Sequence, residues 1–466
     1  MDKPIVPPTS PRGLASYAWW LVLCLVGLDY FSTLAYLPSL AVDEADKMAP
    51  FAALGVVALT LFAALPVYLY VIGRSPHGHG ATGLLEKHVT GWTGKILILF
   101  LLGFIATDFV VTRTLSTADA AKHLIHNPYW QTPVDWMTRH KDSLRASLPV
   151  ALREPLFDFW NEQLVLTLLL SILGFVVYAF LLRGFSRTFL YVSAFVVVLF
   201  LAVNGMVIGS GLVYLYHHPD LTTQFTDVVR YGGREISAEE LLFTLFLTLV
   251  QFPQLALGLG GFELSMASAP LVRGRPSDDP VQPRGRIRNM RLLLVAAAVL
   301  MSLFLAGSVL VVTMLVPKAL LHPAQPVQQE PAASQSEMMP QDEGDDLDVP
   351  APSQPVPTVE KEGPARDRAL AYIAHGGTLA GGLEAQQVSP LFGPAFGTLY
   401  DVSTVLILCL AGASVTISLR DLVPGYLTRF GMQMEWARKI GVILHLFNLV
   451  ILVVIVVFKA LSLIHI

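Results

Sequence analysis

Long apolar stretches separated by short polar loops dominate this chain of 466 residues. An apolar helix of about 20 residues is long enough to cross the hydrocarbon core of a bilayer. The pattern therefore predicts an all-α integral membrane protein. The nine predicted spans lie at about 17–42, 50–73, 95–118, 163–184, 187–215, 239–266, 291–316, 397–419 and 439–459.

Basic residues in the short loops predict the orientation. The loops after the second, fourth, sixth and eighth spans are rich in Lys and Arg, and the one after the sixth reads LVRGRPSDDPVQPRGRIRNMR. Such loops stay on the cytoplasmic side. Residues 1–16 are then a cytoplasmic tail, and the first seven spans fill residues 17–316.

An external loop at 317–396 separates these spans from the last two, which fill residues 397–460. Its first part, about 317–364, is rich in Pro, Gln and acidic residues. Such a composition cannot bury enough apolar surface to fold, so we expect a disordered insertion there. The rest of the loop is expected to form short helices over the outer face.

Composition narrows the function classes. Hydrophobic residues make up 54% of the chain and charged residues 14%, against roughly 25% charged residues in a soluble domain. The net charge of -4 says little by itself about partners, and no nucleic-acid partner is expected. The sequence has no P-loop, so neither an ATP-driven pump nor an enzyme is expected, and no cofactor is predicted.

A carboxylate, Asp29, lies in the middle of the first span, in the string GLDYFSTLAY. A charge inside a spanning helix costs about 2.5–3.5 kcal/mol on insertion scales, so it marks a functional site by default. Ser32, Thr33 and Tyr36 follow at helical spacing and bring hydroxyls to the same face.

The third span carries a second carboxylate, Asp108. Thr112, Ser116 and Asp119 follow it at i+4, i+8 and i+11, which forms one polar stripe on an otherwise apolar helix. Carboxylate, hydroxyl and carbonyl oxygens are hard ligands, so these two faces predict a site for a small cation.

A structural reading of Asp108 is that it pairs with Arg113 to fix helix packing. The two residues point about 140° away from each other on an ideal helix, so we expect Arg113 to meet an acid of another helix, with Asp401 as one candidate. His445 in the ninth span is interpreted as a packing residue.

The sixth span is interrupted by glycines and a proline in LVQFPQLALGLGGFELSMA. Breaks at corresponding positions of two halves are typical of inverted-repeat transporters, and the first and sixth spans begin two sets of five. Gly258, Gly260 and Gly261 are therefore predicted binding-site residues. Ordinary glycine-mediated helix packing is the alternative. Glu263 could brace the broken backbone, accept a coupling proton or reach the cytoplasmic interface.

At these residues the chain resembles the amino acid–polyamine–organocation superfamily, whose members share the LeuT-type five-plus-five inverted-repeat fold. The closer likeness is to the KimA-type potassium–proton symporters of bacteria. The matching positions are Asp29, Ser32, Thr33, Ala35 and Tyr36 in the first span, Asp108, Phe109, Val110, Thr112 and Ser116 in the third, and Gly261, Phe262 and Glu263 in the sixth.

The resemblance implies a secondary transporter in the cytoplasmic membrane of a bacterium. Asp29 and Asp108 would coordinate the potassium ion, with Tyr36 beside them, and K+ and H+ would be the transported species. One position departs from the pattern: a threonine of those symporters that helps to bind the ion is matched by Gly260, which has no side-chain ligand.

Two alternatives stay open. Amino-acid permeases of the same superfamily receive the substrate carboxylate on bare amides of the first helix. Asp29 would repel that carboxylate, but an amino acid or polyamine bound through its amine fits the sequence. The other alternative is a non-transporting membrane sensor on the same fold.

A five-plus-five fold also needs a tenth span. The last residues, 461–466, read LSLIHI and resemble a translated sequencing adapter, so we expect the natural chain to continue beyond about Ala460. The expected partners are the lipid bilayer and a small cation or amino acid, and a homodimer is left open.

Overall fold

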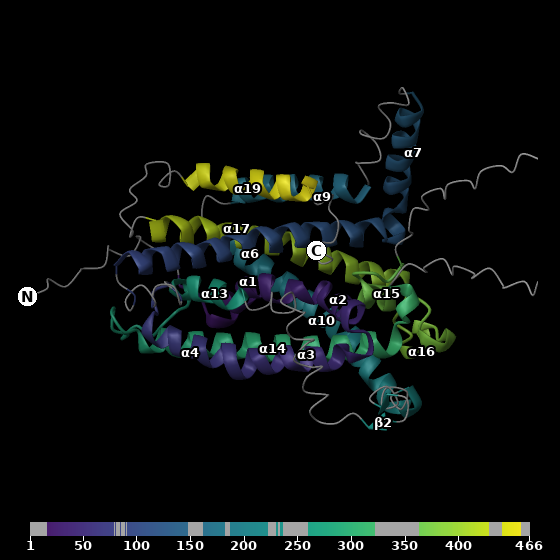
Figure 1. Cartoon of the computed structure of the whole chain (residues 1–466), viewed down its shortest axis with the longest axis horizontal. Helices are drawn as coiled ribbons and strands as arrows, with labels where there is room; N and C mark the ends of the chain where they lie inside the picture. The colour runs from purple at the N-terminus through teal and green to yellow at the C-terminus, as the bar shows by residue number, and fades with distance from the viewer. Residues whose placement is uncertain are drawn as a thin grey trace, which may run out of the picture.

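The computed structural model of this protein describes residues 16–78, 91–147, 162–181, 187–221, 260–321, 363–427 and 440–457, with isolated positions between 80 and 89 and between 230 and 235. Almost all of this part is helical. The helices form a layered bundle, and most of them run along its long axis (Figure 1).

Six helices of the described part are long and apolar enough to cross a membrane, which confirms the prediction of a helical membrane protein. They span Trp19–Asp43, Asp46–Arg74, Gly91–Ile125, Arg187–His217, Arg284–Leu315 and Pro394–Gly412. Helices α9 (Glu162–Leu181) and α19 (Ile440–Val457) lie where the fourth and ninth spans are predicted. Of the predicted sixth span, only the end is described, as α13 (Gly260–Ala267).

The first span is a helix with a tightened middle. Its α-helix α1 (Trp19–Ser32) continues through Asp29, becomes a 3₁₀ turn at Thr33–Ala35 and resumes as α2 (Leu37–Ala45). The sequence places the break within GLDYFST, at residues 27–33, whereas the helix becomes irregular only from Thr33 onwards. Pro38 in the first turn of α2 has no N–H for the preceding turn, which explains the change.

The second span begins with a 3₁₀ turn (Asp46–Met48) and α3 (Ala49–Ala58). It widens to a π-helical turn at Leu59–Ala64 before α4 (Leu65–Arg74). Pro66 lies in the first turn of α4, and its missing N–H and bulky ring favour such a bulge.

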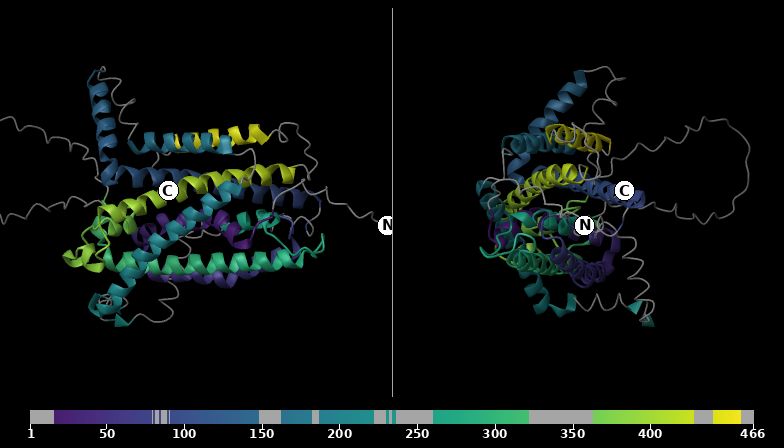
Figure 2. Two further views of the ribbon diagram at one scale, coloured as in Figure 1. Left: turned by 180° about the vertical axis from the view of Figure 1, so that it is seen from behind. Right: turned by 90° about the vertical axis from the view of Figure 1, so that its left-hand side faces the viewer.

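Helices that are five spans apart in the predicted order contact each other. The third span, α6 (Gly91–Ile125), packs along the eighth, α17 (Pro394–Leu427), and the second packs along the seventh, α14 (Arg284–Leu315). Helix α9 contacts α19 outside the α6–α17 pair, which both views of Figure 2 show. Helix α1 contacts α13 and α10 (Arg187–His217) in the middle of the bundle.

One end of the bundle is covered by short elements, in agreement with the predicted outer helices. They are α15 (Ala369–Ala374), a 3₁₀ turn (Ala380–Gly382) and α16 (Ala385–Val388). At the same end, α7 (Gln131–Ser147) follows a 3₁₀ turn (Pro128–Trp130) and stands nearly upright on the bundle (Figure 1). A two-residue pairing joins β1 (Arg230–Tyr231) to β2 (Arg234–Glu235).

The first residues of the predicted disordered insertion, which was expected from about residue 317, belong to the folded bundle. A 3₁₀ turn (Lys318–Leu320) follows α14, and Leu321 is buried in the core. Ala365 N–H donates to the Leu320 carbonyl at 3.0 Å, so the two ends of the insertion lie together. The apolar Leu321 explains the difference, because it can be buried although the residues after it are polar. Residues 322–362 lie outside the described part.

The opposite end of the bundle joins α1 to the segment after α13. Tyr17 N–H donates to the Leu271 carbonyl at 2.7 Å, and Arg273 N–H donates to the Tyr17 carbonyl at 2.8 Å. Leu271 ends the 3₁₀ turn (Ala269–Leu271) that follows α13. The inner ends of the first and sixth predicted spans are therefore held together by backbone hydrogen bonds.

Asp278 organises the basic loop that leads into α14. Its carboxylate accepts N–H groups from Gly285 at 2.9 Å and from Arg275 and Arg286 at 3.0 Å. Burial alone would raise the pKa of Asp278, but these backbone donors together lower it below its ordinary value. A carboxylate with a lowered pKa stabilises the fold above its unfolded pKa and loses that effect as the pH falls through its folded pKa.

We predict that Asp278→Ala loosens this loop, because three backbone N–H groups lose their acceptor. The initial rate of tryptic cleavage between Arg273 and Arg288 should rise at neutral pH. Asp279→Ala is the matched control, since Asp279 accepts one N–H, from Val281 at 2.8 Å. Equal cleavage rates for the two variants would contradict the assigned role of Asp278.

Candidate functional site

Asp29 is buried in the centre of the bundle, on the last turns of α1. The hydroxyl of Ser32 donates to the Asp29 backbone carbonyl at 2.9 Å, and that of Thr33 donates to the Tyr30 carbonyl at 2.8 Å. Both hydroxyl protons are thus used within the helix. Their oxygens keep lone pairs, which can accept a donor or coordinate a cation.

Tyr36 brings together the acids that the sequence singled out. It is buried at the end of the 3₁₀ turn, and its phenol interacts electrostatically with Asp29, Asp119 and Asp108. Asp29 and Asp108 also lie close enough for their charges to interact. Asp29 on the first span and Asp108 and Asp119 on the third thus lie within electrostatic range of the same buried phenol.

The polar stripe of α6 faces the interior. Thr112, Ser116 and Asp119 are all buried, and Asp108 is half-buried. The Ser116 hydroxyl has no hydrogen-bond partner among the described residues. A stripe of oxygen-bearing side chains thus runs along α6 from Asp108 towards the end that the outer helices cover.

The sixth predicted span approaches α1 through a glycine. A Cβ atom at Gly261 would lie 2.8 Å from ring carbons of Tyr30, so only glycine allows this contact. The neighbouring Phe262 packs between two tyrosines, edge-on to Tyr30 at 5.5 Å and stacked on Tyr68 at 5.0 Å. These rings join α1, α4 and α13 close to Asp29.

Glu263 is buried and lies beside two groups of the second span and the loop after it. It interacts with the Tyr68 hydroxyl, and a Cβ atom at Gly80 would collide with its carboxylate. These contacts support the bracing role among those that the sequence leaves open. A role for Glu263 in proton coupling stays a prediction.

The other predicted positions have separate outcomes. Gly260 is the first residue of α13, and Gly258 lies outside the described residues.

The suggested pairing of Arg113 with Asp401 is wrong: Arg113 donates to the Ser171 carbonyl at 3.4 Å, whereas Asp401 contacts residues some three turns further along α6. His445 packs edge-on to Phe175 at 5.4 Å, as a packing histidine should.

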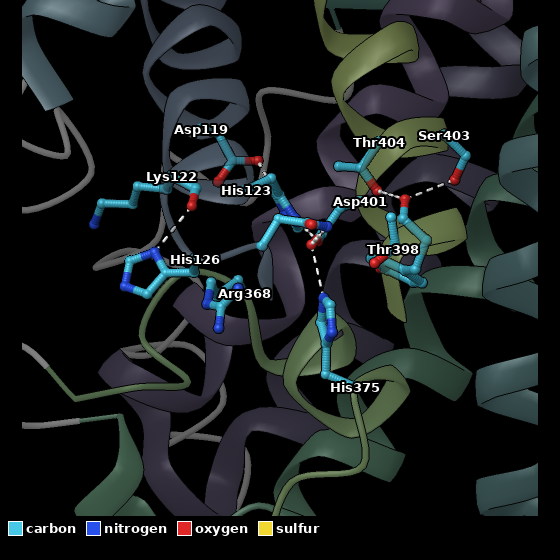
Figure 3. A network of polar contacts seen from close by, with 12 residues as sticks. Asp119, Lys122, His123, His126, Arg368, His375, Thr398, Asp401, Ser403 and Thr404 are labelled. Carbon is cyan, nitrogen blue, oxygen red and sulfur yellow. Dashed lines mark hydrogen bonds and ion pairs between the residues drawn. The ribbon is translucent and has the colours of Figure 1, made fainter. Parts of the chain in front are cut away.

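A histidine–carboxylate network at the outer end was missed from the sequence. Asp401 on α17 is contacted by His123 Nδ1 at 2.7 Å, Asn127 Nδ2 at 2.8 Å and His375 Nε2 at 2.7 Å (Figure 3). The three partners come from α6, the residues just after it and the end of α15. The helical spacing of Asp119 and His123 was the signal of this network in the sequence. Their link to Asp401 could not be seen there, because His375 and His123 lie 26 and 278 residues away from it in the chain.

Charged groups surround this network. Lys122 on α6 forms a buried ion pair with Asp367, just before α15. Burial lowers the pKa of the neighbouring Arg368, whereas Asp401, Asp119 and Tyr372 favour its charged form. Among the described residues, no group of three or more His, Cys, Asp or Glu side chains could hold a metal ion in common.

We predict that Gly261→Ala disturbs the α1–α13 contact, because its methyl group would overlap the Tyr30 ring. Overpacking of this kind costs about 1–3 kcal/mol, so the unfolding midpoint of the purified protein should fall. Gly209→Ala on α10 is the control, since nothing lies within 4 Å of a Cβ atom there. A midpoint for Gly261→Ala equal to that of the control would show that the contact adapts.

No protein-family model and no curated protein matches this sequence. The case for a function therefore depends on the geometry of the polar cluster and on the helix contacts around it.

Proposed function

We propose that this protein is a secondary active transporter that imports a small cation, with potassium the favoured substrate, and that protons drive the import. The observation that carries the proposal is that Asp29, Asp108 and Asp119 all lie within electrostatic range of the buried phenol of Tyr36, inside an apolar bundle. Carboxylates in such surroundings need a cation, a proton or several donors nearby.

The chemistry of the cluster favours a monovalent cation. Its carboxylates and hydroxyls, together with the phenol of Tyr36, are hard oxygen ligands. Two hydroxyls close to Asp29 cannot donate to its carboxylate in this arrangement, since Ser32 and Thr33 donate to backbone carbonyls. A cation between Asp29 and Asp108 would remove the repulsion between their charges.

The helix contacts support a five-plus-five arrangement. Contacts between the first and sixth, second and seventh, third and eighth, and fourth and ninth predicted spans are what two repeats related by a two-fold axis would produce. In such transporters, substrate sites lie where the discontinuous helices meet near the bilayer midplane. Asp29 and Gly261 lie on the two helices that would meet there.

Alternating access would expose the cluster to each side in turn. The joined pair α1 and α13 would rock against the layer of α6 and α17, and the cation would move with the boundary between them. An amino acid that docked its carboxylate on α1 would meet the charge of Asp29. A cationic amine is the remaining organic candidate and is included in the test below.

We predict that Asp29→Asn abolishes uptake while the protein still inserts and folds. Removing one charged partner from a buried ion site costs about 3–5 kcal/mol, so the apparent affinity for the cation should fall by at least about 100-fold. The measurement is rubidium-86 uptake into proteoliposomes, with Asp43→Asn, an acid at the end of the same span, as the matched control.

The substrate class is tested by complementation. The chain should restore growth of a potassium-uptake-deficient bacterium on low potassium and should not rescue an amino-acid auxotroph run beside it. Rescue of the auxotroph alone would replace the cation by an amino acid. Normal rubidium uptake by Asp29→Asn would remove this residue from the site.

A further inference from the structure

The outer histidine–carboxylate network contains one acid that its hydrogen bonds do not explain. Asp401 receives three donors, from His123, Asn127 and His375, and so is fully satisfied. Asp119 is 6% exposed, yet neither of its carboxylate oxygens has a hydrogen-bond partner among the described residues. A buried acid in that state is costly when ionised, unless a proton or a charge is supplied.

His123 lies between the two acids. An ionised carboxylate can only accept, so the His123 nitrogen that contacts Asp401, Nδ1, is the donor. The other ring nitrogen, Nε2, then carries a lone pair, lies 3.9 Å from Asp119 Oδ2 and has no hydrogen-bond partner among the described residues. A lone pair and an unpartnered carboxylate thus face each other with room for one shared proton.

We propose that Asp119 and His123 form the site that binds the coupling proton on the outer side of the transporter. Asp401 is a positioning residue, because its bond to Nδ1 leaves Nε2 turned towards Asp119. The site rests on the proposed transport function and adds to it the group that takes up the proton. A purely structural role for the network would explain Asp401, but it leaves the bare oxygens of Asp119 unexplained.

Burial indicates the direction from which the proton arrives. His375, on the other side of Asp401, is 12% exposed, whereas the side chains of His123 and Asp401 are 0% and 2% exposed. His375 belongs to the short elements that cover the outer end of the bundle (Figure 3). The network therefore extends from the covered surface inwards to Asp119.

The groups that face the pair come from several elements. Lys122 lies on α6, Asp367 and Arg368 precede α15, His375 follows it, Tyr400 and Asp401 lie on α17, and Tyr36 follows the 3₁₀ turn of the first span. The charged groups around Asp119 are of both signs, with Lys122 and Arg368 cationic and Asp367 anionic.

The charge balance links the proton to the cation. Binding one proton, on Asp119 Oδ2 or on His123 Nε2, changes the pair from a net charge of minus one, a carboxylate with a neutral imidazole, to a net charge of zero. Asp119 also interacts with Tyr36, which interacts in turn with Asp29 and Asp108. One proton at Asp119 and one cation at the other two acids therefore each remove one negative charge from the same cluster.

The test measures rubidium-86 uptake and acidification of the lumen in proteoliposomes as the outer pH is varied. The wild-type uptake rate should rise by about tenfold per pH unit of outer acidification until the site saturates, because a single proton-binding step has that slope. In His123→Gln and Asp119→Asn, uptake should become independent of outer pH and the lumen should not acidify. Rubidium exchange should remain measurable in His123→Gln, which leaves all three acids around Tyr36 in place.

Asn127→Ala is the matched control, because it removes a hydrogen bond from the same Asp401 without removing a titratable group. It should keep the wild-type pH profile. A wild-type profile in His123→Gln would overturn the proton site and leave the cation site standing, and equal losses in Asn127→Ala and His123→Gln would assign the network to structure. A wild-type chain that moves no rubidium under any condition would overturn both proposals.

Discussion

The free-energy cost of removing carboxylates from water is the main physical constraint on the interior of this protein. Asp29, Asp119 and Asp401 are all buried among apolar helices, and each meets that cost differently. Asp401 does so with three hydrogen-bond donors, Asp119 faces a histidine without bonding to it, and Asp29 has another acid as its electrostatic neighbour. Among these three acids, Asp119 is the one whose two carboxylate oxygens have no hydrogen-bond partner among the described residues, whereas Asp401 is fully bonded.

The helices around the polar cluster are packed through uncharged aromatic contacts. Gly261 lets α13 approach the Tyr30 ring, and Phe262 stacks on Tyr68, so the helix with Asp29 is fixed by aromatic contacts. Aromatic rings give a large contact area without adding charge. The charged surroundings of Asp29 thus come from other acids, Asp108 among them.

Much of this could be predicted from the sequence, because hydrophobic length and helical spacing are local properties. The spans, the irregular first helix and the stripe from Asp108 to Asp119 follow from them. The partner of Asp401 could not be predicted, since it depends on which turn of α6 meets α17. The buried Leu321 depends likewise on contacts between segments that are distant in sequence, since Leu320 accepts the N–H of Ala365.

The backbone bonds between Tyr17 and the segment after α13 have a mechanical consequence. Tyr17 donates to Leu271 and accepts from Arg273, so neither strand of this short pairing can slide past the other without losing both bonds. The pair is thus a fixed point at this end of the bundle. A small rotation of the first span about it would displace most the far end of that span, where Ser39 accepts the N–H of Ala369.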